Sequence, residues 1–150
     1  LLKETVKFDK DVNKKIARKI LLKKPKKILI LGLSYKSDVK VSILSPSIDL
    51  YYFFQKKKIK VDMFDPLFKK SEMEKIIKCK YLDNFNLTNY DSVIFMVNHK
   101  VFQDTIKSKI KNMKNVKMIM DNTGYLKKYE DIIKRKNCNL IITGKSNWLS

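Results

Sequence analysis

Short apolar runs alternate along the chain with longer stretches in which apolar and charged positions recur at helical spacing. The apolar runs predict strands that are buried on both faces, at residues 27–33, 60–64, 92–97, 116–120 and 140–143. The helical patterns between them lie at residues 45–57, 69–78, 100–112 and 126–136. This alternation is typical of βαβ units. We therefore predict an α/β fold with a Rossmann-like, doubly wound parallel sheet in three layers.

An amphipathic helix is predicted before the first strand. Val12, Ile16 and Ile20 recur at every fourth position with charged residues between them, and Pro25 stops the pattern. This helix either covers an edge of the sheet or is the end of a long linker helix that arrives from an upstream domain.

The start of the chain favours the linker interpretation, because the first residue is Leu1 and not an initiator methionine. We therefore expect residues 1–24 to be the end of a central linker and dimerisation helix, and residues 25–150 to be one α/β domain. A chain of 150 residues with 44% hydrophobic content is long enough for one such core. No apolar run is long enough to span a bilayer, and the first residues lack a signal-peptide pattern. A cytoplasmic protein without membrane contact is expected.

The net charge of +19 raises the possibility of nucleic-acid binding. However, only Arg18 and Arg135 among the 34 basic residues are arginine, and the lysines are spread along the whole chain. Base recognition relies on the bidentate guanidinium group of arginine. A solvated lysine-rich surface is the favoured interpretation, with no specific nucleic-acid partner.

The cysteines and the single histidine have no spacing that would hold a metal ion. Cys79 and Cys138 lie far apart and are read as buried, inert thiols. His99 follows a predicted strand, where a general base is one interpretation. Because no acid or nucleophile is near it in sequence, a helix-capping or partly buried histidine is the favoured alternative.

The turn after the first strand contains one glycine, Gly32, where a dinucleotide-binding loop needs three. The following helix starts late: Ser45 is a good N-cap, Pro46 suits the first helical position, and Asp49 complements the helix dipole. Lys36 lies in the long loop between strand and helix. It is either part of an anion site with the free N–H groups of that helix or one more surface lysine.

Four segments resemble, in order and spacing, the C-terminal domain of the UDP-glucose, UDP-N-acetylhexosamine and GDP-mannose 6-dehydrogenase family. The first is KILILGLSYKSDVKVSILSPSIDL, with its lone glycine, Lys36 and the Ser–Pro helix start. The others are VDMFDPL, YDSVIFMVNHKVFQD and IMDNTGYL. Each motif is short, but together they cover nearly the whole chain.

The resemblance implies that this domain holds the UDP part of a nucleotide sugar, whose C6 alcohol the whole enzyme oxidises to a carboxylate. NAD and the catalytic cysteine would belong to an N-terminal domain, and the leading helix would form a homodimer. Tyr35, Lys36 and Thr123 would face the UDP-sugar. The chain contains neither the glycine-rich loop nor the cysteine motif, so we expect it to be inactive by itself.

The chain departs from the family pattern at three places. Thr123 replaces an arginine that grips the nucleotide, residues 40–44 replace acidic residues and an Arg–Glu pair, and Asp9 replaces an asparagine of the central helix. The alternative is therefore a degenerate, non-catalytic Rossmann-like module that serves dimerisation or partner binding.

Overall fold

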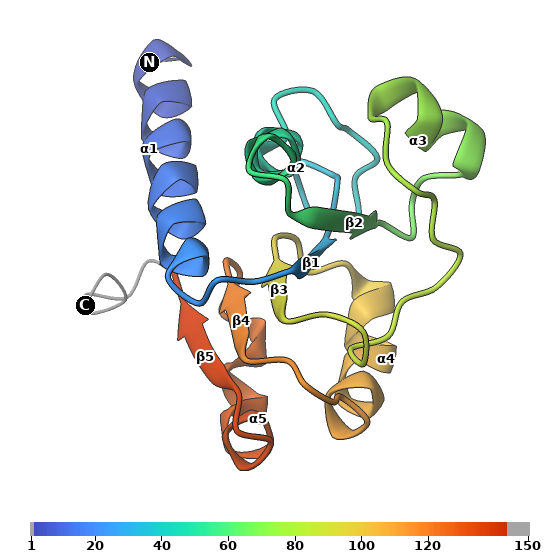
Figure 1. Ribbon diagram of the computed structural model, residues 1–150. Helices are drawn as coiled ribbons and strands as arrows, with labels where there is room; N and C mark the ends of the chain where they lie inside the picture. The colour runs from blue at the N-terminus through green and yellow to red at the C-terminus, as the bar shows by residue number, and fades with distance from the viewer. Residues whose placement is uncertain (1, 144–150) are drawn as a thin grey trace.

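The computed structural model describes residues 2–143, with side chains from Val12 onward (Figure 1). Five parallel strands form one sheet in the order β2-β1-β3-β4-β5. Their bounds are β1 Lys27–Leu31, β2 Lys60–Phe64, β3 Ser92–Phe95, β4 Met118–Asp121 and β5 Asn139–Ile142. Every predicted strand is present, and the prediction of a parallel α/β sheet preceded by a helix is confirmed.

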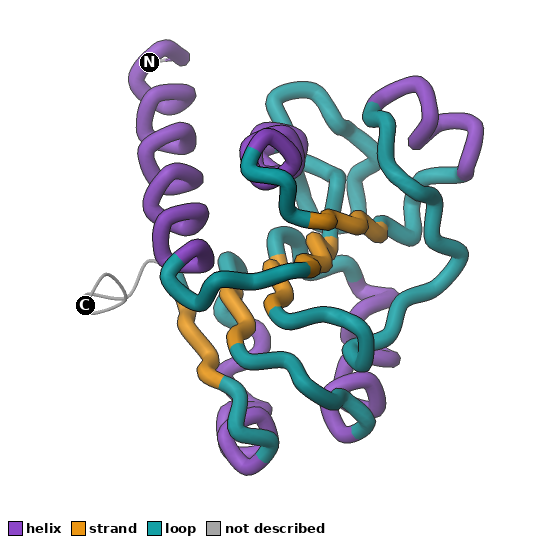
Figure 2. Tube along the Cα trace, viewed as in Figure 1, coloured by secondary structure: helices purple, strands orange, loops and turns teal. Residues whose placement is uncertain are grey.

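The helices lie on both faces of the sheet (Figures 1 and 2). They are α1 Leu2–Leu21, α2 Pro46–Lys56, α3 Lys70–Ile76, α4 Lys100–Lys111 and α5 Glu130–Arg135, with a 3-10 helix η1 at Tyr125–Tyr129. The last predicted helix is thus divided in two. A buried carboxylate, Asp121, accepts the N–H of Leu126 and binds the start of this segment to its own strand.

The sheet is covered on both faces because successive strand residues point to opposite sides. In β1, Ile28 and Ile30 pack into the cluster beneath α1 and α2. Leu29 and Leu31 pack into the other cluster, beneath α4 and α5. All four side chains are buried, which explains the uninterrupted apolar run.

The second half of α1 packs on this domain. Ile16, Ala17 and Ile20 are buried against the sheet and α2, so this half covers the end of the sheet that carries β4 and β5. The helix ends at Leu21, four residues before Pro25. Lys24, directly before the proline, has left the right-handed helical region and adopts a left-handed φ of 49°.

Within the described part of the chain, no helix is both long and apolar enough to cross a membrane.

Candidate functional site

The carboxyl ends of the strands gather the loops that carry the candidate residues. In the sheet order, β1 lies between β2 and β3. The chain passes from β1 to β2 on one side, and then crosses to β3 on the other side of β1. In open α/β sheets such a reversal of strand order opens a crevice in which ligands bind. The loop after β1 lies at this reversal.

Gly32 is required by close packing between two strand ends. Its φ is +106°, and a Cβ at this position would lie 2.8 Å from Cβ of Val97, at the end of β3. Its N–H donates to the carbonyl of Phe64. The lone glycine thus permits strand contact, and α2 begins only at Pro46. These residues do not form the glycine-rich cradle that a dinucleotide pyrophosphate needs.

The start of α2 agrees with its prediction. Ser45 is the N-cap, and its Oγ accepts the N–H of Ser47 at 3.3 Å. Pro46 is the first helical residue, and Asp49 lies in the first turn. The Ser47 hydroxyl donates to the carbonyl of Gly32, so this helix end is attached to the end of β1. The N-terminus of α2 therefore belongs to the same edge as the loop.

Tyr35 and Lys36 lie together in the long loop and are both exposed. The N–H of Tyr35 donates to the carbonyl of Val41 at 2.7 Å, and Lys36 forms an isolated antiparallel bridge with Val39. Lys40 is paired with Glu72. Lys36 has no side-chain partner among the described residues, so its charge is available to a ligand.

Thr123 lies at the same edge but in another turn. Its N–H and Oγ1 both donate to Oδ1 of Asp121 at 2.8 Å, and its Oγ1 accepts the N–H of Tyr125. The loop with Lys36 follows β1 and the turn with Thr123 follows β4. Because β3 lies between β1 and β4, these two strands are two strand spacings apart, roughly 10 Å. The structure therefore groups Tyr35 with Lys36 and leaves Thr123 apart from them.

Asp65, which was not among the residues predicted from the sequence, organises this edge. One carboxylate oxygen accepts the backbone N–H groups of Leu33 and Ser34, each at 2.8 Å, and the Ser34 hydroxyl at 3.0 Å. The other accepts the N–H of Leu67. Burial alone raises the pKa of Asp65, but hydrogen bonds from His99, Ser34 and Leu67 outweigh it and hold the pKa below its ordinary value. The available signal was an Asp–Pro pair at a strand end.

His99 is completely buried at the N-cap position of α4. Its side chain makes no capping bond. Instead, Nε2 lies 3.0 Å from Oδ2 of Asp65, the oxygen that also accepts the N–H groups of Leu33 and Ser34. The ring stacks on Phe102. The expectation of a buried or capping histidine is confirmed in burial and position, whereas the general-base interpretation is disfavoured because no solvent reaches the ring.

The cysteines are unpaired; Cys138 is buried and Cys79 is half-buried. Burial raises the pKa of Cys79 to about 11 and that of Cys138 to about 12. These thiols are therefore protonated near neutral pH and are poor nucleophiles. No cluster of three metal-ligating side chains occurs among the described residues.

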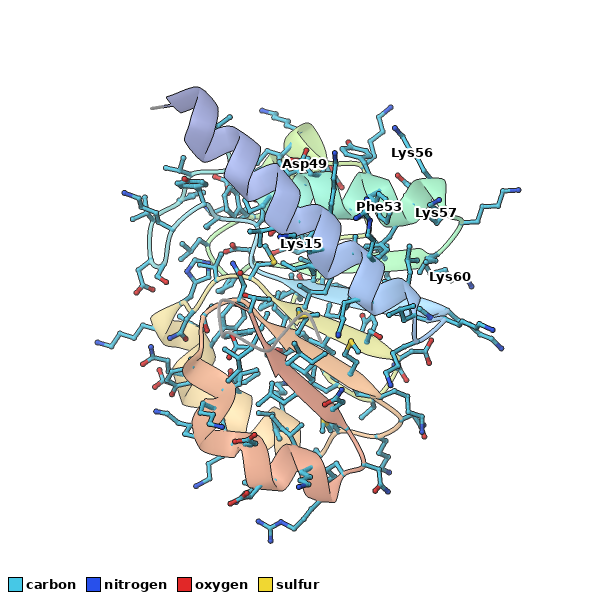
Figure 3. All side chains as sticks on the ribbon, turned by 90° about the vertical axis from the view of Figure 1, so that its left-hand side faces the viewer. Lys15, Asp49, Phe53, Lys56, Lys57 and Lys60 are labelled. Carbon is cyan, nitrogen blue, oxygen red and sulfur yellow. The ribbon has the colours of Figure 1, made fainter. Side chains whose placement is uncertain are left out.

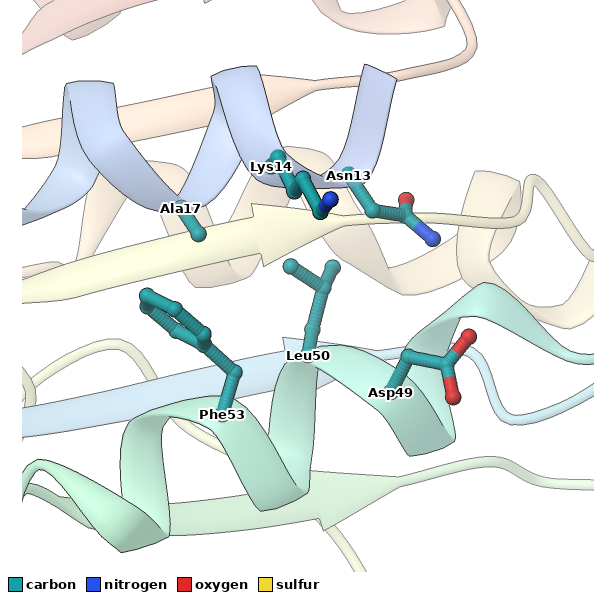
Figure 4. A pocket seen from close by; sticks show the side chains of 6 residues that line it. All are labelled: Asn13, Lys14, Ala17, Asp49, Leu50 and Phe53. Carbon is teal, nitrogen blue, oxygen red and sulfur yellow. The ribbon is translucent and has the colours of Figure 1, made fainter. Parts of the chain in front are cut away.

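Two cavities lie away from the loop. A groove of about 220 Å³ between α1 and α2 is lined by Asn13, Lys14, Ala17, Asp49, Leu50 and Phe53 (Figure 4). A more open hollow of about 430 Å³ at the start of β2 is lined by Lys58 and Lys60, among others; Figure 3 shows Lys60 on the side of the molecule where α2 ends at Lys56. Neither cavity is lined by Tyr35, Lys36 or Thr123.

The fold thus defines a doubly wound α/β domain, with the exposed Lys36 in the loop after β1 at the carboxyl edge of its sheet. Residues 29–128 match the family model described as "UDP-glucose/GDP-mannose dehydrogenase family, UDP binding domain". The chain belongs to this family, through its UDP-binding domain. The matched range runs from β1 through the turn that contains Thr123. The family is NAD-dependent.

Solved structures resemble the chain in fold. The UDP-N-acetyl-mannosamine dehydrogenase Cap5O from S. aureus matches with a TM-score of 0.63 and 19% identity, over 94% of this chain and 31% of that protein. A UDP-D-ManNAc dehydrogenase from Pyrococcus horikoshii matches with a TM-score of 0.50 and 19% identity, over 79% of this chain and 27% of that one. The chain therefore spans less than a third of either protein. No curated protein matches it in sequence.

Proposed function

We propose that the carboxyl edge of this domain binds the UDP part of a nucleotide sugar, as the substrate half of an NAD-dependent nucleotide-sugar 6-dehydrogenase. UDP-glucose and UDP-N-acetylhexosamines are the candidate substrates. The observation that carries the proposal is the family match, because it covers both the Lys36 loop and the Thr123 turn. In the whole enzyme the sugar C6 alcohol is oxidised to a carboxylate, and NAD is the hydride acceptor.

Lys36 supplies positive charge to a phosphate or sugar oxygen in this proposal, and Tyr35 packs beside it. The exposed, unpaired ammonium group of Lys36 supports this role. Thr123 stands where the family resemblance implies an arginine, and it offers only a short hydroxyl that is already bonded to Asp121. We therefore expect weaker nucleotide binding than in relatives that keep the arginine.

A calorimetric titration of the chain with UDP tests the proposal, with uridine and inorganic tripolyphosphate as comparison ligands. Lys36→Ala removes a charge-assisted bond of about 1.5–3 kcal/mol and should weaken UDP binding about tenfold or more. The exposed Lys114 provides the control. Lys114→Ala makes the same change in net charge, but beyond the C-terminal end of α4. Equal affinity of the Lys36→Ala and wild-type chains for UDP would remove Lys36 from this role.

Thr123→Arg is the complementary gain-of-function test. A guanidinium group adds a fork of donors at the same edge and should tighten UDP binding while leaving uridine binding unchanged. An unchanged affinity for UDP would show that this turn does not face the nucleotide.

A degenerate, non-catalytic module remains the second candidate. The observation that favours it is the apolar loop: Ile43 is 76% exposed and Leu44 65% exposed in the loop that carries Lys36, where the family resemblance implies charged residues. In this case no UDP-sugar would raise the melting temperature, and the chain would form a stable dimer through residues 6–20. For either candidate we also propose that the chain dimerises through α1. In this proposal residues 1–24 are the dimerisation helix and residues 25–150 are the α/β domain.

A further inference from the structure

We propose that His99 is a positioning residue that fixes the loop bearing Tyr35 and Lys36. This inference rests on the proposed function. The backbone N–H of Asp38 donates to Nδ1 of His99 at 2.9 Å. In return, Oδ1 of Asp38 accepts the N–H of Lys100 at 2.9 Å. These two bonds join residues more than 60 positions apart and attach the far side of the loop to the start of α4.

The two ends of the short segment that carries Lys36 are held by the same pair of buried side chains. On one side Ser34 donates to Asp65 through its N–H and its hydroxyl. On the other side Asp38 donates to His99, whose Nε2 lies 3.0 Å from Asp65. Only residues 35–37 lie between these anchors. The Asp65–His99 pair therefore holds both ends of this segment, and the backbone bonds from Tyr35 to Val41 and from Val39 to Lys36 complete its shape.

The bonding pattern also determines the protonation of the imidazole ring. Because Nδ1 accepts the Asp38 N–H, it carries no proton, and the proton must lie on Nε2, which donates to Asp65. The ring is therefore a neutral bridge with one donor and one acceptor. A proton on Nδ1 would leave the Asp38 N–H without its acceptor and release this side of the loop.

Asp38 itself requires this support. Its φ is +58°, in the left-handed region, which aspartate enters as a single residue when hydrogen bonds support it. The side chain is more than half exposed, so packing does not hold it there. The bonds to His99 and Lys100 supply the missing restraint.

Two substitutions separate the positioning role from the structural role. In His99→Gln the amide nitrogen reaches the place of Nε2 and keeps the bond to Asp65, but the acceptor for Asp38 is lost. In His99→Asn the oxygen reaches the place of Nδ1 and keeps the Asp38 bond, but Asp65 loses a donor. We expect His99→Gln to unfold near the wild-type urea midpoint and to bind UDP about tenfold more weakly. His99→Asn should lose stability and keep its UDP affinity, measured under conditions in which it is folded.

The experiment uses the present chain and combines UDP titration with amide hydrogen exchange of residues 35–38. His99→Gln should speed the exchange of the Asp38 N–H at least tenfold, without a matching change at Leu33 and Ser34, whose bonds to Asp65 remain. Equal UDP affinity and equal Asp38 exchange in His99→Gln and wild type would overturn the proposal. If the wild type does not bind UDP, the proposed function fails, while faster Asp38 exchange in His99→Gln would still establish the tether.

Asp38→Gly provides a second variant should His99→Gln not fold. Glycine tolerates the left-handed φ and keeps the N–H that His99 accepts, but it lacks the carboxylate for Lys100. It should weaken UDP binding less than His99→Gln does. Asn115→Gly is the matched control, because Asn115 also has a left-handed φ, of 66°, in an exposed turn outside the loop. An equal loss of UDP affinity in both glycine variants would contradict the proposal.

The chain has one histidine, so its imidazole ¹⁵N signals need no assignment. The proposal requires a protonated Nε2 and an unprotonated Nδ1 near neutral pH. The opposite tautomer would exclude the bond from Asp38 and overturn the proposal.

Discussion

Two buried aspartates at the same edge of the sheet organise their surroundings in different ways. Asp121, at the end of β4, accepts three bonds, from Thr123 and Leu126, all within five residues of itself. Asp65, directly after β2, accepts one such local bond, from Leu67. Its other donors are Leu33, Ser34 and His99, between 31 and 34 residues away.

The difference shows how one residue type supports either a turn or a site. Asp121 shapes a turn that the neighbouring sequence could form by itself. Asp65 joins the segments that follow β1, β2 and β3, so it fixes these three loops relative to one another. Substitutions at Asp65 should therefore affect the whole domain, and those at Asp121 mainly one turn.

The largest effect is expected from removing the two carboxylates. Asp65→Ala leaves five donors without their acceptor and should lower the free energy of unfolding by about 4 kcal/mol or more. Asp121→Ala leaves three donors, which a relaxed turn can expose to water, and should cost about 2 kcal/mol. Urea unfolding of both variants measures the comparison. Equal losses would mean that the long-range bonds of Asp65 add nothing beyond a local turn.

Replacing Gly32, in the region of Asp65, should destabilise the domain more than replacing Gly124, in the region of Asp121. Gly32→Ala combines a left-handed φ with a 2.8 Å approach to Val97 and should cost about 3 kcal/mol. Gly124 also has a positive φ, of 84°, but no atom lies within 4 Å of the added Cβ, so Gly124→Ala should cost about 1 kcal/mol. Thermal unfolding distinguishes them. A larger loss at Gly124 would contradict the packing argument.

Acid should weaken the contribution of Asp65. Its folded-state pKa lies below the ordinary value of 3.8, so the ionised carboxylate stabilises the fold above that value. This contribution is lost as the pH falls through 3.8 toward the folded-state pKa. The stability difference between wild type and Asp65→Asn should therefore be largest at neutral pH and shrink below pH 4, as measured by urea unfolding at several pH values. A difference that does not depend on pH would argue against an ionised Asp65.

The smallest effect is expected at Thr123. Thr123→Ala removes one exposed hydroxyl, which donates to Asp121 and accepts the N–H of Tyr125, and should cost less than about 1 kcal/mol. Thr88 offers a matched control, because its N–H and hydroxyl bond to Asn86 in the same pattern. Thr88→Ala should cost slightly less, since a neutral amide is a weaker acceptor than a carboxylate. Urea midpoints of the two variants test this order.

The fold was predictable because its signals are local. The strand at residues 60–64 was predicted with its exact bounds, although it is the edge strand β2 and is not buried on both faces: Lys60 is exposed and Asp62 is half-buried. The N-cap at Ser45 was also found, because capping depends on a few consecutive residues. The division of the last helix into η1 and α5 was missed, although the bond from Leu126 to Asp121 that accompanies it spans only five residues.

The candidate site was only partly predictable. Lys36 and Tyr35 follow a recognisable strand and glycine, so their place at the carboxyl edge could be expected. Asp65 carried only a weak signal, and nothing in the sequence around His99 indicated that its two ring nitrogens join different loops.

The sequence by itself determined the order of strands and helices, the late start of α2 and the family to which the chain belongs. These depend on residue patterns over a few to some twenty positions. Only the tertiary structure decided that Asp65, His99 and Asp38 form one connected set, and that Gly32 serves strand packing. Such contacts depend on which strands become neighbours in the sheet. The separation of two residues in the sequence does not tell how far apart they lie in space.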